Sequence, residues 1–431
     1  MSERQIPKGY KHTEIGVIPE DWDCLCINDV ARVKGGKRLP PGFSLVDELT
    51  LYPYIRVSDM YPGGINTTNI KFVPLEAYPA IKNYRIFTKD IFISVAGTLG
   101  IVGVIPQELD GANLTENADI ITDIQCDRNY LLYWLMSESI QQTIESIHTV
   151  GAQPKLALGR IAQFRIAVPR KRTEQRAIVE ALADVDGLLA ALDKLIAKKR
   201  AIKKAAMQQL LTGKTRLPGF SGEWEVRSLG DIANLKHGYA FRSETYTDDG
   251  PYIVVTIRNV QDGKLDLGEY NTISELPPDI QSHQILNIGD MLISLTGNVG
   301  RVCRVTQHNC LLNQRVGLIV PNYVSCDFIY FLLGRLDFLT EMIMKAKGGA
   351  QGNLGKRDVL EHKFCLPKDD REQRAIATVL SDMDAEIEAL ERRREKTQQV
   401  KQGMMQQLLI GRVRLVNPEY RQDKRSPNEY V

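Results

Sequence analysis

The sequence lacks the features of a membrane-spanning, secreted or zinc-binding protein. It has no run of about 18 apolar residues, so no membrane-spanning helix is expected. The polar start MSERQIPKGYKHTE is unlike a secretory signal, which predicts a cytoplasmic location. The seven cysteines form no CxxC pair. Cys303, His308 and Cys310 lack a fourth ligand at zinc spacing, so we expect no metal.

Catalytic motifs are also missing. There is no GxxxxGK[ST] phosphate loop, no HExxH pair and no methyltransferase tetrapeptide of the NPPY type. The two halves of the chain do not share titratable residues as a duplicated enzyme would. A net charge of only +2 gives no general basic surface for nucleic acid. These absences predict a non-catalytic binding scaffold.

What the sequence does contain is a long internal repeat. The segment Glu174–Leu217 returns without a gap at Glu372–Leu415, with nearly half of its positions identical. The 431 residues thus divide into two copies of about 200 residues, each the size of one domain. Because the repeat is cyclic in character, we expect a pseudo-twofold relation between the copies.

Each repeated segment has the pattern of one long helix. Apolar residues recur every three or four positions, as in a coiled coil, at Ile178, Leu182, Val185, Leu189, Leu192 and Ile196, then at Ile376, Leu380, Met383, Ile387 and Leu390. Thr173 is the expected N-cap of the first helix, and Asp369 with Glu372 fits a capping box at the second. Gly213 and Gly411 are the expected stop signals.

Helices of about 38 residues would extend roughly 57 Å, too far to be covered by their own domains alone. We therefore expect the two helices to pack together as an antiparallel coiled coil. Gly187 and Gly403 lie inside them, where close approach of the helices would explain a glycine.

The rest of each copy alternates short Val- and Ile-rich runs with Gly, Pro, Asn and Asp, and ends in an amphipathic stretch. This predicts an α+β fold with two mixed globular domains joined by the two helices. The expected boundaries are 1–170 and 218–368 for the globular domains, 171–217 and 369–415 for the helices, and 416–431 for a C-terminal tail.

The order of domain, helix, domain and helix, with EQxxI at each helix start and MQQLLxGxxRL at each end, resembles the specificity subunit of type I DNA restriction-modification systems. The resemblance covers essentially the whole chain. It implies that each globular domain is a target recognition domain for half of a split DNA site. It also implies that the helices space these domains and dock two modification (methyltransferase) subunits. S-adenosylmethionine, ATP and Mg would belong to partner subunits, which include restriction and translocase subunits, and this chain would hold no cofactor.

Two unlike domains should read two unrelated half-sites, spaced so that both face the same side of the duplex. Base edges are read by Arg, Lys, Asn and Gln on positioned loops. The first-domain candidates are Lys34, Lys37 and Arg38 in a flexible basic loop, then Arg56, Thr98, Gln153 and Lys155. The second-domain candidates are His237, Arg242, Arg258, Asn259, Asn298, Arg301, Arg304, Gln351, Asn353, Lys356 and Arg357. For Thr98 and Asn298, a role in the turn alone is the alternative.

The first helix carries a basic stretch without acidic residues, comprising Lys198, Lys199, Arg200, Lys203 and Lys204. We expect it to face spacer phosphates, with pairing to the acidic surface of a partner as the alternative. The residues kept in both helix ends are predicted to dock the same partner twice: Met207, Gln208 and Gln209, repeated as Met405, Gln406 and Gln407.

Two other functions remain open at this point. One is a coiled-coil scaffold that joins proteins without reading DNA, and the other is a stand-alone dimeric regulator. An intrinsic nuclease or methyltransferase is excluded by the missing motifs.

Overall fold

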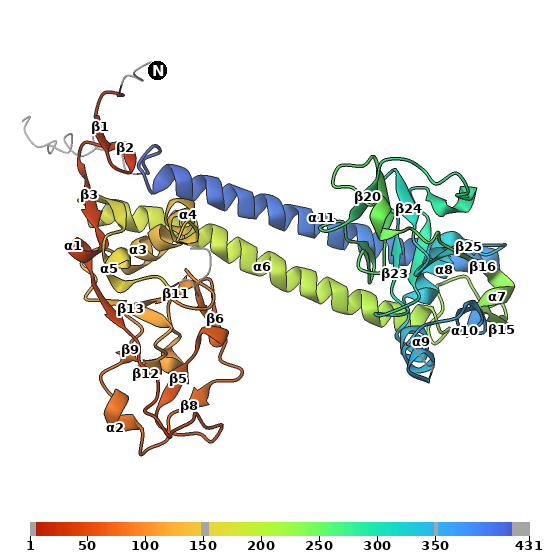
Figure 1. The fold of residues 1–431 in the computed structure, drawn as a ribbon, viewed down its shortest axis with the longest axis horizontal. Coiled ribbons are helices and arrows are strands. Elements are labelled where there is room, and N and C mark those ends of the chain that lie inside the picture. The colour runs from red at the N-terminus through yellow and green to blue at the C-terminus, as the bar shows by residue number, and fades with distance from the viewer. Residues whose placement is uncertain (1–5, 148–154, 349–351, 416–431) are drawn as a thin grey trace, which may run out of the picture. The chain divides into compact units, whose positions relative to one another are not determined.

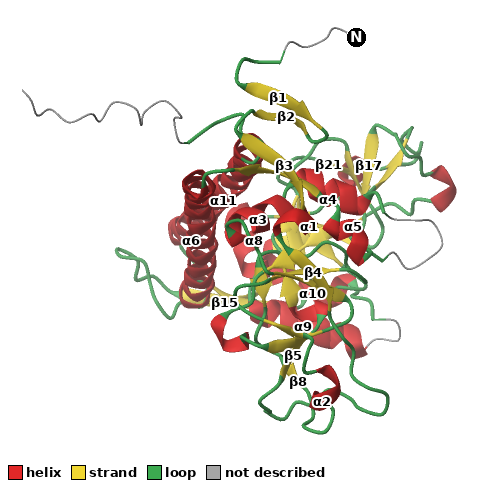
Figure 2. Ribbon diagram, turned by 90° about the vertical axis from the view of Figure 1, so that its left-hand side faces the viewer, coloured by secondary structure: helices red, strands yellow, loops and turns green. Residues whose placement is uncertain are grey.

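The computed structural model describes residues 6–147, 155–348 and 352–415, which form two compact units. The first unit comprises residues 1–191 and 393–431, and the second comprises 192–392. Each unit contains one globular domain, part of helix α6 (Arg172–Leu210) and part of helix α11 (Asp370–Leu408) (Figure 1). The mixture of strands and helices in both units is visible in Figure 2. The expected α+β class, with two mixed domains and an internal repeat, is confirmed.

The first globular domain is built on two four-stranded sheets, ordered β11-β10-β13-β4 and β8-β5-β12-β9, with three two-stranded pairs, β1-β2, β14-β3 and β6-β7. All neighbours are antiparallel except β5 and β12, which are parallel. The strands are β1 (Tyr10–Thr13), β2 (Gly16–Pro19), β3 (Trp22–Cys26), β4 (Arg32–Gly35), β5 (Pro53–Ile55), β6 (Met60–Tyr61), β7 (Gly64–Ile65), β8 (Lys71–Phe72), β9 (Arg85–Ile86), β10 (Ile91–Ser94), β11 (Val102–Gly103), β12 (Ala112–Leu114), β13 (Ala118–Thr122) and β14 (Arg165–Pro169). The helices are α1 (Ile27–Val30), α2 (Tyr78–Ile81), α3 (Arg128–Leu135), α4 (Glu138–Glu145) and α5 (Leu158–Ala162).

The second domain repeats this plan with sheets β16-β25-β22-β23 and β20-β17-β24-β21, and pairs β15-β26 and β18-β19. Here the parallel neighbours are β17 and β24. The strands are β15 (Trp224–Ser228), β16 (Ala233–His237), β17 (Tyr252–Val255), β18 (Val260–Gln261), β19 (Lys264–Leu265), β20 (Asn271–Ile273), β21 (Ile285–Leu286), β22 (Met291–Ser294), β23 (Val302–Arg304), β24 (Cys310–Leu312), β25 (Val316–Pro321) and β26 (Lys363–Pro367). The helices are α7 (Leu229–Ile232), α8 (Cys326–Leu333), α9 (Leu336–Gly348) and α10 (Lys356–Leu360).

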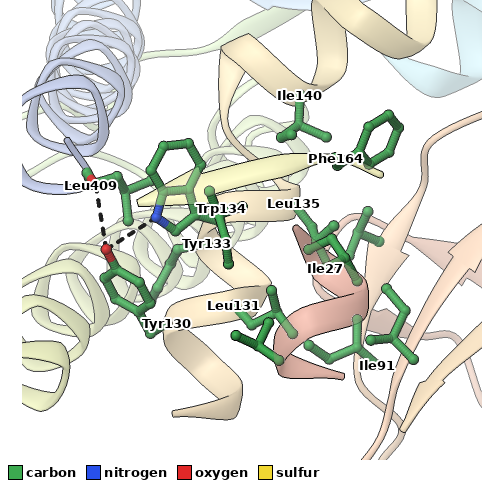
Figure 3. Close-up of a cluster of buried hydrophobic side chains, with 14 of the residues drawn as sticks. Ile27, Ile91, Tyr130, Leu131, Tyr133, Trp134, Leu135, Ile140, Phe164 and Leu409 are labelled. Carbon is green, nitrogen blue, oxygen red and sulfur yellow. Dashed lines mark hydrogen bonds between the residues drawn. The ribbon is translucent and has the colours of Figure 1, made fainter. Parts of the chain in front are cut away.

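The core of the first unit joins the sheet to the end of α11. Tyr130 and Trp134 of α3 lie in it, both almost fully buried, and Leu409 follows α11 (Figure 3). The Tyr130 hydroxyl donates to the carbonyl of Ala167 at 2.8 Å and approaches that of Leu409 at 3.3 Å, while Trp134 Nε1 donates to the hydroxyl at 3.1 Å. The end of α11 is therefore part of the first unit's core.

Helices α6 and α11 run antiparallel where they meet in each unit. In the first unit, Lys401 of α11 pairs with Asp186 of α6 at 2.6 Å. In the second unit, Lys203 of α6 pairs with Asp384 of α11. These two ion pairs are the same pair in the two copies of the repeat. The predicted antiparallel packing of the helices is confirmed.

Details of the helix ends differ from the expectation. Each helix has 39 residues. Thr173 is the second residue of α6, so it is not the N-cap. Asp369 does cap α11, because its carboxylate accepts the N–H of Arg371 at 2.9 Å. Glu372, which was expected to complete a capping box, has both carboxylate oxygens bound by Arg216.

The glycines of the two helices play different parts. Gly213 and Gly411 have φ of +70° and +69°, which confirms them as helix stops. Gly187 and Gly403 are exposed, and a Cβ at either position would meet nothing within 4 Å. The expectation that close helix approach requires these two glycines was therefore wrong.

Candidate nucleic-acid interface

The structure brings together two sequence-predicted segments in each unit, the turn after β10 or β22 and the segment before α5 or α10. In the first unit, Ala96 forms a β-bridge with Lys155, and the N–H of Leu156 donates to the carbonyl of Val95 at 3.0 Å. In the second unit, the equivalent bridge joins Thr296 and Asn353. Gln153 and Gln351 lie outside the described residues. The turns that carry Thr98 and Asn298 therefore begin beside Lys155 and Asn353 respectively.

The two turns are held in one shape by a serine. The Ser94 hydroxyl donates to the carbonyl of Thr98 at 2.6 Å and accepts the N–H of Ile101 at 2.8 Å. Ser294 does the same with Asn298 at 2.5 Å and Arg301 at 3.0 Å. The serine thus binds the backbone of Thr98 and Asn298, whose side chains are exposed at the tip. A rigid tip with an exposed side chain suits base recognition, because little ordering entropy is lost on binding.

Glycines make the second tip possible. Gly297 and Gly300 both have positive φ, at +67° and +78°. A Cβ at Gly300 would lie 2.9 Å from Cβ of Met342 in α9. The tip therefore packs closely on α9, with a backbone that other residues rarely adopt.

The basic segment after β4 is not a flexible loop. Lys34 belongs to strand β4, and the N–H of Lys37 donates to the carbonyl of Leu114 at 2.8 Å. A Cβ at Gly36 would lie 2.0 Å from the carbonyl oxygen of Thr115, so only glycine fits there. Lys34, Lys37 and Arg38 are exposed, and Arg38 forms a 2.9 Å ion pair with Glu116. The expectation of flexibility was wrong, since backbone hydrogen bonds pin this segment.

Several predicted base readers are engaged within their own domain. Arg56 binds Asp59 through two nitrogens, at 2.9 and 2.6 Å, and this carboxylate raises the arginine pKa. The counterpart of Asp59 in the second unit is Asn259, which is buried and accepts the N–H of Thr256 at 2.9 Å. Arg56 and Asn259 therefore organise a loop. Arg258 pairs with Glu269 at 2.8 Å, but both are exposed.

The remaining second-domain candidates fall into two groups. Arg304 pairs with Asp327 at 2.6 Å and stacks 4.4 Å from the Tyr330 ring centre, which commits it to packing on α8. Arg301 donates to Gln261 of β18. The exposed candidates are His237, Arg242, Asn298, Asn353, Lys356 and Arg357, of which Lys356 and Arg357 belong to α10. Arg357 also pairs with Glu361, one turn further along the chain, at 2.5 Å.

The sequence analysis missed one buried acidic residue of the first domain. Asp119 of β13 is 5% exposed and pairs in register with Gly35 of β4. Burial raises the pKa of its carboxyl to about 6, and the nearby charge of Lys155 works in the opposite direction. The available signal was an acidic residue inside the otherwise apolar run ADIIT.

Most of the basic stretch on α6 is bound by acidic residues of α11. Lys199 pairs with Glu386 and Arg200 with Glu391, both at 2.6 Å, in addition to the Lys203 pair described above. Neither a spacer phosphate nor a partner protein was needed to pair these three residues, because their acidic partners lie on the second helix of the same chain. Lys198 and Lys204 are exposed.

The repeated MQQLL segments contribute to both core and surface. Met405 is buried in the first unit's core, and Met207 packs against the core of the second. Gln208, Gln209 and Gln406 are exposed, and Gln406 donates to Glu138 of α4. The carbonyl oxygens of Gln209 and Gln407 accept the N–H groups of Thr215 and Arg412 at the helix ends, at 3.2 and 2.9 Å.

Other repeated residues close each unit on itself. Arg414 binds Glu174 and Asp21, and Arg216 binds Glu372 in the matching position. These contacts explain why the E of EQxxI and the R of MQQLLxGxxRL recur in both copies. The recurrence of these residues in both copies is the sequence signal for the contact.

Within the described part of the chain, every helix is too short or too polar to cross a bilayer. The same residues contain no grouping of three His, Cys, Asp or Glu side chains suited to hold a metal ion.

Comparisons with known proteins point to one family. A putative type I restriction enzyme MjaX specificity subunit of Methanocaldococcus jannaschii is 25% identical over 430 residues, covering 95% of this chain and 97% of that protein. The MjaIX specificity subunit of the same organism is 23% identical over 397 residues, covering 83% and 85%.

Solved structures share the fold. The type I restriction-modification S subunit from M. genitalium superposes with a TM-score of 0.53 at 17% identity, covering 90% of this chain and 96% of that one. A chain from a study of complex assembly and conformational transition of the type I restriction-modification system gives the same TM-score and identity, covering 92% and 99%. The family model for the type I restriction modification DNA specificity domain matches residues 19–203 and again 221–401. Both copies of the repeat are thus matched, and the chain belongs to the type I restriction modification DNA specificity family.

Proposed function

We propose that each unit reads one half of a bipartite DNA target through the surface formed by its turn tip and the adjoining bridged segment. The family gives the general role, which is that of a specificity subunit without catalysis of its own. The observation that carries the finer proposal is the pair of bridges Ala96–Lys155 and Thr296–Asn353. Each bridge joins the base of a turn to a second segment that carries a polar side chain. The turn itself is held by a serine and has an exposed side chain at its tip.

The chemistry at the two surfaces differs. The first surface presents Thr98 and Lys155, and the second presents Asn298 and Asn353. Asparagine suits adenine, whose N6 and N7 it bonds together, while lysine suits guanine or phosphate and threonine contacts the thymine methyl group. Two chemically different surfaces support two unrelated half-sites and not a palindrome.

Other exposed basic residues complete the proposed interface. Lys34, Lys37, Arg242 and Lys356 are suited to phosphates, which position a protein without reading sequence. Arg38, Arg258, Arg301 and Arg357 reach DNA only by exchanging their present partners. Arg56 and Arg304 are assigned to loop and core contacts and are not retained as base readers.

We further propose that 1–170 and 218–368 are the recognition domains, while 171–217 and 369–415 space them and dock two modification subunits. The support is that Gln208, Gln209 and Gln406 are exposed on repeated segments whose neighbouring apolar residues are buried. Lys198 and Lys204 remain the candidates for spacer phosphates. The modification subunits would bring S-adenosylmethionine, and the restriction and translocase subunits ATP and Mg, to cytoplasmic DNA.

Methylome sequencing of cells carrying the complex tests this function. We expect a split motif with methylated adenine in both halves and undefined bases between them. Exchanging residues 295–300 for the first-domain turn 95–100 should alter the second half of the motif and leave the first half unchanged. A continuous palindrome would contradict the proposal. Normal assembly with modification subunits but no DNA preference would favour a protein scaffold instead.

A further inference from the structure

A groove on the second unit lies between the end of α6 and helix α9. It encloses about 1190 Å³, and its walls include Met207 and Gln208 from α6 with Leu336, Leu339 and Met344 from α9. Its lining contains more apolar than polar surface. The groove therefore borders one of the two segments assigned above to partner docking.

Helix α9 has two apolar faces. Phe338, Met342 and Ala346 face the core and are buried. Leu336 and Met344, which line the groove, are 58% and 67% exposed, and Ile343, which is not part of its lining, is 39% exposed. Their spacing of seven and eight residues puts them on one side of the helix. An exposed apolar stripe of this kind marks an interaction surface more often than a free one.

The first unit shows that the fold does not require this stripe. In the ungapped alignment of the repeat, the counterparts of Leu336, Ile343 and Met344 in α4 are Glu138, Glu145 and Ser146. All three are exposed, and Gln406, the counterpart of Gln208, donates to Glu138. The exposed face of this helix is thus polar in the first unit and apolar in the second.

The charges at the edge of the groove that have no ion-pair partner are mostly basic. Its acidic residues Asp337 and Glu341 are paired with Arg335 and Lys345. Lys204 and Lys214 are exposed at its edge, and no ion pair joins either of them to another described residue. With Asp262 as the opposing charge, the groove offers an apolar floor with a basic rim.

We propose that this groove binds an amphipathic helix with acidic residues along its flank, supplied by one of the two modification subunits. This proposal rests on the docking role proposed above. Helix α9 has 13 residues and extends about 20 Å, which matches a partner helix of three to four turns. Helix-in-groove binding uses anchors at this spacing. Because α4 lacks the stripe, only one modification subunit of the pair gains the contact.

The two docking steps are therefore unequal. One modification subunit binds through the repeated helix ends and the groove, while the other binds through the helix ends alone. A complex with a single modification subunit should accumulate at low concentration, with that subunit on the second unit.

The test transfers the first unit's residues to the second. The variant carries Leu336→Glu, Ile343→Glu and Met344→Ser together, since α4 already carries these residues at the same positions. The matched control is Tyr323→Ser, which removes an exposed aromatic residue outside the groove lining (94% exposed). Full-length chain is titrated with modification subunit, and each bound state is counted by native mass spectrometry. Circular dichroism checks that both variants fold.

We expect the tighter step to weaken tenfold or more in the triple variant, so that the two steps become equal, with no change in the control. Lys214→Glu should weaken the same step and reduce its dependence on salt. If both binding steps keep their affinities in the triple variant, the proposal is overturned. A groove that serves a second copy of this chain would show instead as self-association that the triple variant removes. If the unaltered chain binds no modification subunit at all, the proposed docking function fails, which is a different outcome.

Discussion

Arg414 binds both carboxylate oxygens of Glu174, at 2.7 and 2.8 Å, and so ties the segment that follows α11 to the start of α6 within the first unit. Arg216 and Glu372 form the same pair in the second unit, at 2.5 and 2.6 Å. The Glu174 and Glu372 side chains are 3% and 1% exposed. A carboxylate that deep in the protein depends on its partner, because a buried charge left unpaired is strongly destabilising.

Replacing Arg414 by alanine should destabilise the first unit by about 3 kcal/mol, because Glu174 keeps its buried charge without a partner. Urea unfolding followed by tryptophan fluorescence measures this, since Trp22 donates to Glu174 at 3.3 Å. The exposed Arg412→Ala provides the control. Adding Glu174→Gln to Arg414→Ala should recover part of the loss, and a double variant no more stable than the single one would refute the explanation.

Lys401→Ala should cost more stability than Lys199→Ala. The Lys401 side chain is only 10% exposed and lies 5.5 Å from the Tyr133 ring centre, so its removal leaves Asp186 with only the Tyr133 hydroxyl, at 2.8 Å, and exposes packed surface. Lys199 and Glu386 are 32% and 50% exposed, which is the range where ion pairs contribute about 0–1 kcal/mol. We expect a difference of about 1–2 kcal/mol in chemical denaturation. Equal losses would show that burial does not set the strength of these pairs.

Gly187→Ala and Gly403→Ala should each stabilise the chain by about 0.5–1 kcal/mol. Both positions are inside helices, where glycine is less favourable than alanine, and both have room for a Cβ. Thermal unfolding of the single and double variants measures the gain, which should be additive. A loss of stability would mean that the space beside these residues is filled. A gain accompanied by weaker binding of modification subunits would assign the glycines to the partner.

Asp119 should make stability depend on pH. Its folded-state pKa, about 6, lies above the ordinary value of 3.8, so the folded chain holds its proton over a range where the unfolded chain has lost it. Stability therefore falls as pH rises from about 4 to about 6, by at most about 3 kcal/mol, and this contribution is level above that range. Asp119→Asn should remove the slope and raise the melting temperature at pH 8, while the exposed Asp123→Asn should not. A slope that persists in Asp119→Asn would place the titrating group elsewhere.

Asn298→Ala should lower discrimination in one half-site only, by about 1–3 kcal/mol for the base that it contacts. Thr98→Ala should act on the other half-site, with a smaller effect because threonine offers one hydroxyl and one methyl group. Binding of the assembled complex to a set of duplexes with single base changes measures both. Uniform weakening across all duplexes would instead indicate a phosphate contact or a damaged turn.

The sequence predicted the larger features because repetition and periodicity are properties of long segments. The two helices, their antiparallel packing and the glycine stops at 213 and 411 followed from apolar spacing and from the repeat. The capping box predicted at Glu372 was wrong. Glu372 could bond either the start of its own helix or Arg216, and the sequence around Glu372 does not show which of the two it bonds.

The candidate site was harder to predict, because exposed Arg, Lys and Asn look alike in a sequence. Arg304 is bound by Asp327, which is 23 residues away, and no local pattern shows that this pair forms. Arg56 lies only three residues before Asp59, but that spacing alone does not indicate an ion pair. Asp119 was missed because its burial and its nearness to Lys155 depend on segments distant in the sequence. The β-bridges that assemble each tip join segments about 60 residues apart, which no local pattern reveals.

The repeated ion pairs have a consequence for how such a chain can change its length. Lys203 pairs with Asp384, and Lys401 with Asp186, so α6 and α11 span equal numbers of residues between these fixed points. A turn inserted into α6 alone would leave one helix too long for the other. A tolerated change of length must then arise twice, at two distant places in the coding sequence, or by recombination that exchanges both at once. Helix length should accordingly vary among relatives in matched steps, whereas the recognition surfaces are free to change one residue at a time.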